Sequence, residues 1–275
     1  MNPHLSKSGS PKALLLSLWF HRSLAYQLTK REVVGRYRGS VAGLAWSFFN
    51  PLLMLAVYTF VFSVIFQARW SGLEAGKGGF AIVLFVGVLV HGIFAECLNR
   101  APTLIIANTN YVKRVMFPLE ILPWVAMGSA LFHAFISLIV LVLAQFVVIG
   151  SVPSTALLFP IILAPLILTT MGVAWILAAF GVYLRDIGQI TVVITTVALF
   201  LSPVFYPVTA LPEEYRVLFL MNPLTFIIEQ AREVMIWGRL PDWHGLALYF
   251  ATSLAVAWIG FWTFQKMRRG FADVL

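Results

Sequence analysis

The chain has 275 residues, of which 60% are hydrophobic and only 11% are charged, whereas soluble proteins average about 45–50% and about 25%. This composition excludes a soluble globular domain. The formal net charge is +8, but 19 Lys and Arg residues spread among 23 Phe and 9 Trp do not form the dense basic surface that nucleic-acid binding needs. We therefore expect a membrane protein without a nucleic-acid partner.

The first residues form a charged segment that precedes the first long apolar run. Between Pro11 and Arg38, apolar side chains such as Leu15, Leu18 and Trp19 recur at near-helical spacing among basic ones. This pattern predicts an amphipathic helix on the cytoplasmic leaflet. It fits both a basic membrane anchor and a docking surface for a cytoplasmic partner. We expect residues 1–40 to form a cytoplasmic N-terminal segment and residues 41–275 the membrane domain.

Runs without charged residues mark the segments that can lie in lipid, because an ionised side chain at the bilayer centre costs at least about 2.5–3.5 kcal/mol. A helix needs roughly 20 residues to cross the bilayer, so the 64-residue run 121–184 crosses twice. The turn-forming residues 150–154 mark its fold-back. The sequence thus predicts an all-α polytopic membrane protein with six transmembrane helices, at about 42–66, 79–99, 121–149, 156–183, 187–202 and 245–265.

An even number of crossings places both termini on the same side of the membrane. Most of the 19 basic residues lie on that side, and the opposite side holds only Arg69, Lys77, Arg216, Arg232 and Arg239. By the positive-inside rule, both termini are expected to be cytoplasmic.

The longest external connection spans about 203–244. Ser202-Pro203, Tyr206-Pro207 and Leu211-Pro212 interrupt the chain there, yet residues 219–237 remain largely apolar. This pattern predicts short re-entrant helices between the fifth and sixth transmembrane helices, because irregular backbone is tolerated at that depth where protein or water surrounds it.

No catalytic or metal-binding motif is expected. His91 and His133 lie on different predicted helices without a second ligand at metal-binding spacing, so packing or a buried hydrogen bond is the expected role of each. Glu96 lies near the cytoplasmic end of the second predicted helix, about one turn from Arg100. We expect these two side chains to form an ion pair.

Several motifs occur together along the chain, in a fixed order. They are Arg31-Glu-Val-Val-Gly-Arg-Tyr-Arg-Gly-Ser followed by Trp46 and Asn50-Pro51, then Val112 to Pro123, Tyr183-Leu-Arg185-Asp186-Ile187, Ser202-Pro-Val-Phe-Tyr206-Pro207 and Asn222-Pro223-Leu224. In this order and at these membrane positions, they resemble the membrane permease of type 2 ABC exporters for polysaccharides and polyol phosphates. The Ser-Pro-Val-x-Tyr-Pro stretch is more similar to the O-antigen and teichoic acid branch than to the capsule branch.

The resemblance implies an assembly and a function. The permease would form a homodimer with two copies of a separate cytoplasmic ABC ATPase, and would export a lipid-linked polysaccharide, most closely an O-antigen, across the bacterial cytoplasmic (inner) membrane. The chain would itself be no enzyme and would bind no cofactor, because ATP and Mg would be bound by the partner ATPase.

The resemblance also implies where the ATPase acts. Force would enter through cytoplasmic loops, and the candidate coupling residues are Tyr111, Lys113, Arg114, Phe117, Arg185 and Asp186. The alternative is that the basic residues among them only follow the positive-inside rule.

Aromatic side chains are the candidates for contact with sugar, because rings stack on the weakly polar faces of sugars. Tyr58, Phe62 and Phe66 recur every four residues and share one face of the first predicted helix. The full set of candidate channel residues is Trp46, Phe49, Tyr58, Phe62, Phe66, Trp124, Phe132, Trp175 and Tyr206. Lipid-facing or helix-packing roles are the alternative for each.

Two other function classes stay open. One is a type 2 ABC permease for a drug or a small lipid. The other is a membrane-embedded glycosyl- or acyltransferase, for which the external acids Glu213, Glu214, Glu229 and Glu233 form a cluster without a known motif.

Overall fold

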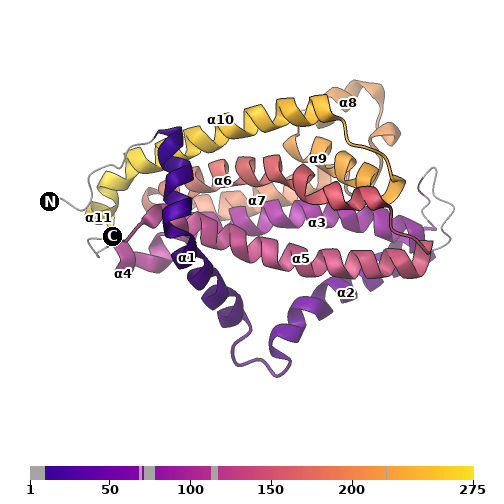
Figure 1. Cartoon of the computed structure of the whole chain (residues 1–275), viewed down its shortest axis with the longest axis horizontal. Coiled ribbons are helices and arrows are strands. Elements are labelled where there is room, and N and C mark those ends of the chain that lie inside the picture. Colours follow the sequence, from indigo (N-terminus) through magenta and orange to yellow (C-terminus); the bar gives the residue numbers. More distant parts are fainter. Residues whose placement is uncertain (1–9, 68–69, 71–77, 113–116, 221) are drawn as a thin grey trace.

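The computed structural model describes residues 10–67, 70, 78–112, 117–220 and 222–275. Within these ranges every regular element is a helix and there is no β-strand, which confirms the expected all-α fold. Most of the long helices lie side by side along the longest axis of the molecule, and the N-terminal helix crosses them (Figure 1).

Among the residues that the structure describes, five stretches are long and apolar enough to cross a membrane: Gly43–Ile65, Gly79–Thr103, Leu119–Ile149, Ser154–Tyr183 and Trp243–Val274. They contain the helices α2 (Trp46–Tyr58), α3 (Gly79–Arg100), α5 (Leu122–Ile149), α6 (Phe159–Tyr183) and α10 (Trp243–Met267). These candidate spans match five of the six expected crossings. Four have boundaries close to those predicted, and the last extends to Val274 instead of about 265. The turn expected near residue 150 is also present, since Gly150 ends α5 in the left-handed conformation with φ +84°.

The expected fifth crossing corresponds to α7 (Ile187–Phe200), which has 14 residues. A helix of this length spans about 21 Å, whereas the hydrocarbon core is about 30 Å thick. It is a shorter apolar helix than the other five spans, so the sixth crossing remains an expectation.

The N-terminal helix α1 (Pro11–Arg36) crosses the flank of the bundle and packs against α5 (Figure 1). One side of it is buried, with Leu14, Ala25, Leu28 and Val33 against the rest of the chain. The opposite side leaves Trp19, Phe20 and Tyr26 exposed. The expected N-terminal helix is therefore present, and its place on a membrane leaflet stays a prediction.

Helices α6 and α10 make the most extensive contact in the bundle, and glycines allow it. A Cβ atom at Gly172 would lie 2.5 Å from the carbonyl oxygen of Val256, and one at Gly260 would collide with the backbone of Gly172. The two backbones thus cross in direct contact, as small residues permit between membrane helices.

The two ends of the bundle differ. The short helices α4 (Thr109–Val112) and α11 (Phe271–Val274) lie at one end, and α8 (Glu213–Leu220) and α9 (Pro223–Arg232) lie at the other (Figure 1). The chain thus forms helices in the expected external region, and their entry into the membrane stays a prediction.

Arg232 holds α9 against the bundle. Its side chain is 1% exposed and lies 4.5 Å over the ring of Trp70. It donates hydrogen bonds to Glu229 at 2.8 Å, to the carbonyl of Val204 at 3.0 Å and to that of Val83 at 3.3 Å. Burial lowers the pKa of Arg232 to about 10, so the guanidinium stays charged at neutral pH. This side chain therefore joins α9, α3 and the segment after α7.

Candidate functional site

The connection between α3 and α5 contains most of the predicted coupling residues. The ring of Tyr111 on α4 stacks on Phe117 at 4.1 Å, with an angle of 9° between the planes. Arg31 of α1 donates a hydrogen bond to the hydroxyl of Tyr111 at 2.8 Å. We call residues 109–118 the coupling segment. Its two ends contact each other through these rings, and Tyr111 connects it to α1. Lys113 and Arg114 lie outside the described residues.

A buried ion pair follows the coupling segment. Arg268, at the end of α10, donates to the carboxylate of Glu120 at 2.6 Å and to the carbonyl of Phe117 at 3.1 Å. Trp175 of α6 donates from its indole nitrogen to the carbonyl of Glu120 at 3.1 Å. The chain beside the coupling segment is thus bonded to both α6 and α10. This pair could not be predicted from the sequence, because Glu120 and Arg268 each lie just outside a different predicted span and no local spacing relates them.

Arg185 and Asp186 form an exposed turn between α6 and α7. Both side chains are accessible to a partner, as a coupling role would require. Whether an ATPase contacts them stays a prediction.

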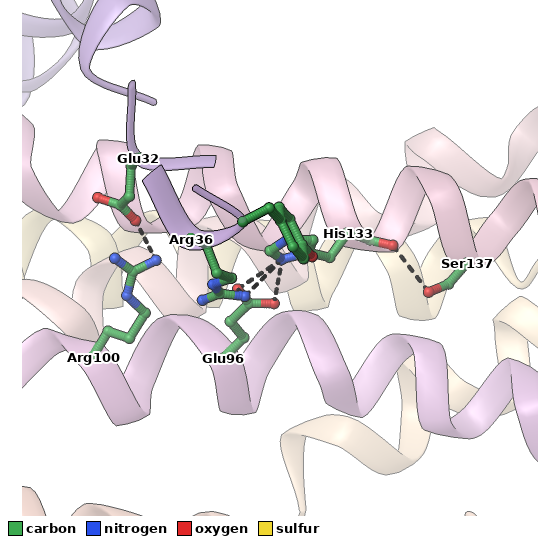
Figure 2. Close-up of polar contacts among 7 residues, drawn as sticks. Glu32, Arg36, Glu96, Arg100, His133 and Ser137 are labelled. Atoms are coloured by element: carbon green, nitrogen blue, oxygen red, sulfur yellow. Dashed lines mark hydrogen bonds and ion pairs between the residues drawn. The ribbon is translucent and has the colours of Figure 1, made fainter. Parts of the chain in front are cut away.

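A cavity of about 270 Å³ lies between the end of α1 and the helices α2, α3 and α5. Its lining is mostly apolar, and we call it the polar cavity after the charged side chains among its lining residues. Glu96 of α3 accepts hydrogen bonds from Arg36 and from Nδ1 of His133, each at 2.8 Å (Figure 2). A His133 tautomer with its proton on Nδ1 leaves Nε2 to accept a bond from the Tyr37 hydroxyl at 3.1 Å. We call Arg36, Tyr37, Glu96 and His133 the polar cluster.

The expected ion pair between Glu96 and Arg100 is wrong. Arg100 pairs instead with Glu32 of α1, and Glu96 pairs with Arg36 and His133 (Figure 2). The physical reason is the position of α1, whose last turns bring two charged side chains alongside α3. Sequence spacing alone revealed only the local partner. His133 and His91 do form buried or half-buried hydrogen bonds as expected, with His91 bonded to the carbonyl of Thr195 at 2.9 Å.

The aromatic residues of the first span do not share one environment. Trp46 and Phe49 are exposed at the start of α2, and Tyr58 lines the polar cavity. Phe62 stacks on Phe80 at 5.5 Å and on Phe205 at 5.8 Å, whereas Phe66 is 67% exposed. The chain is π-helical over Thr59–Ile65, a form often found at functional sites.

The other aromatic candidates lie mostly in packed surroundings. Trp175 is 1% exposed and meets Trp124 edge to face at 5.8 Å. Phe132 is half-buried next to His133. The Tyr206 hydroxyl donates to the carbonyl of Phe200, at the end of α7. Contact of any of these side chains with substrate stays a prediction.

Comparison with known proteins decides the class of this bundle. Residues 23–236 match the ABC-2 type transporter family. The chain belongs to this family. As an ABC-2 membrane subunit it carries a transport function and no catalytic one, and ATP hydrolysis belongs to a separate ATPase.

Three relatives of this ABC-2 subunit cover nearly all of it. The O-antigen export system permease protein RfbA of Myxococcus xanthus is 28% identical over 94% of this chain and 98% of its own length. The protein of the same name from Klebsiella pneumoniae is 25% identical over 90% of this chain and 93% of its own. The polysialic acid transport protein KpsM of Escherichia coli is 22% identical over 84% and 88%.

Proposed function

We propose that this chain is the membrane permease of an ABC exporter for a lipid-linked polysaccharide of the O-antigen type, in a bacterial inner membrane. The observation that supports this most is the similarity to O-antigen export permeases along almost the entire length of both chains. The polysialic acid transporter is similar over a smaller share of the chain, at lower identity.

The proposed assembly contains two permease copies and two copies of the ATPase. In it α7 makes the sixth crossing, α8 and α9 dip into the external face of the membrane, and both termini are cytoplasmic. The distribution of basic residues supports this orientation. A closed twofold assembly is the commonest arrangement of a homo-oligomer.

In the proposed mechanism, the ATPase pushes on the coupling segment and on the turn at Arg185 and Asp186. The Tyr111 hydroxyl connects the segment to α1. Glu120, which directly follows the segment, connects the chain to α6 and to the end of α10. A small shift at the cytoplasmic end would therefore move several helices together, as in rigid-body switching.

Deleting the gene for this chain in its host tests the proposal. We expect the polymer to disappear from the cell surface and to accumulate inside, and a plasmid copy to restore export only if the partner ATPase is active. Surface polymer at the normal level in the deletion strain would contradict the proposal. An altered resistance to drugs or an altered small lipid in that strain would favour the alternative ABC-2 substrates.

A further inference from the structure

The polar cavity contains hydrogen-bonding groups that the fold does not use. Asn50 and Tyr58 of α2 both line it. Asn50 is exposed and Tyr58 is half-buried, and within the part of the chain that the structure describes neither the Asn50 amide nor the Tyr58 hydroxyl makes a hydrogen bond. Placing a polar side chain within a membrane span costs free energy, and such residues mark functional sites. The polar cluster explains the charges of the cavity, but these two side chains remain to be explained.

The charge of the cavity restricts the ligand. Arg36 and Glu96 pair with each other at 2.8 Å, so their charges cancel. Any anion that approached Arg36 would also approach the carboxylate of Glu96, and like charges repel strongly at short range. The site is therefore better suited to a neutral ligand than to a phosphate.

A few hydrogen-bonding groups in a mostly apolar lining suit a sugar, which presents both hydroxyl groups and weakly polar faces. Arg36 supplies donors and Glu96 supplies acceptors, while Asn50 and Tyr58 can each do both. A sugar hydroxyl likewise donates and accepts. The half-buried ring of Tyr58 lines the same cavity and can contact the less polar face of a sugar.

From these observations we propose that the polar cavity binds one neutral sugar unit of the exported substrate. This inference rests on the proposed function and adds to it a place where the sugar is held. Tyr58 belongs both to the cavity and to the aromatic series that continues to Phe66. The cavity would thus hold a sugar at the start of that series.

Photocrosslinking in cells that make the polymer tests the proposal directly. A benzophenone amino acid replaces Asn50 in one strain, Phe66 in a second and Leu248 in a third, where Leu248 is an exposed side chain on α10. We expect a polymer adduct at Asn50 and none at Leu248. An absent adduct at Asn50, or an equal one at Leu248, overturns the proposal. An adduct at Phe66 without one at Asn50 would overturn the proposed sugar site but would still support the proposed export function.

Substitutions test the chemistry of the site in the full transporter with its ATPase. Asn50→Ala and Tyr58→Phe each remove a group without a partner in the fold, so a purely structural role predicts no change. Binding of a sugar predicts that the substrate concentration for half-maximal ATPase stimulation rises about two- to tenfold, the value of one hydrogen bond. Tyr26→Phe, at an exposed tyrosine of α1, is the matched control.

Glu96→Gln separates a sugar from an anion. If the cavity binds a neutral sugar, loss of the charged acceptor raises the half-maximal concentration. If the cavity binds a phosphate, loss of the repelling carboxylate lowers it. A lowered value, or unchanged values for both Asn50→Ala and Tyr58→Phe, overturns the proposal.

Discussion

At the scale of single residues, the pair formed by Glu120 and Arg268 is the strongest constraint at the end of the bundle that carries the coupling segment. Glu120 is 1% exposed and Arg268 is 6% exposed. Two charges removed from water gain little net stability from each other, but either one left alone is an uncompensated buried charge. Arg268 therefore depends on the carboxylate of Glu120.

We expect Glu120→Ala to destabilise the protein by about 3–5 kcal/mol, because it leaves the Arg268 guanidinium buried without its carboxylate. Glu120→Leu combined with Arg268→Met should restore most of that stability, since no charge is then buried. Thermal unfolding in detergent measures both. Glu213→Ala, which removes an exposed pair with Arg216, is the control and should change little. The prediction would be contradicted if the Glu120→Ala protein were as stable as the Glu213→Ala control.

At the scale of elements, the sequence predicted helices well and their partners poorly. Charge-free runs located four of the five spans to within a few residues, because hydropathy is a property of contiguous chain. The ion-pair partners of Glu96 and Glu120 come from segments far away in the sequence. No local spacing contains that information.

Part of the candidate site was also beyond prediction. The four-residue spacing of Tyr58, Phe62 and Phe66 correctly indicated a helix. It did not show that Phe62 packs between two other rings while Phe66 is exposed. The π-helical turn after Tyr58 has no sequence signal that we could use.

The turn between α6 and α7 allows a clean test of coupling. Replacing Arg185 and Asp186 together by Ala should leave abundance and thermal stability unchanged, because both side chains are exposed. Export should fall if the ATPase engages this turn. Surface polymer measured against the amount of permease in the membrane gives the result. Undiminished export would remove the turn from the coupling path.

At the scale of the whole molecule, one copy does not show a complete pathway. Helices α2 and α7 carry many exposed apolar side chains, among them Leu53, Val57, Val193 and Phe200. Lipid or a second copy can cover such surfaces equally well in physical terms. The proposed homodimer therefore needs a direct measurement.

We expect native mass spectrometry of the purified permease to give a dimer, and two ATPase copies to join it when both proteins are produced together. The isolated permease should not hydrolyse ATP, which a steady-state assay measures. A monomer that still exports polymer after reconstitution with its ATPase would argue against the twofold pathway. ATP hydrolysis by the permease alone would contradict the assignment of this activity to a separate ATPase.

The charges that join α1 to α3 have an evolutionary consequence. Glu32 faces Arg100 and Arg36 faces Glu96, so the order of signs on one helix is the mirror of the order on the other. A slip of α1 by one turn in one direction would bring Arg36 to Arg100, and a slip in the other direction would bring Glu32 to Glu96. Like charges in contact are unfavourable in either case. The helix can therefore dock in a single register. Related chains that reverse the sign at position 36 are expected to reverse it at position 96 as well, and a chain with only one of the two changes should accumulate poorly.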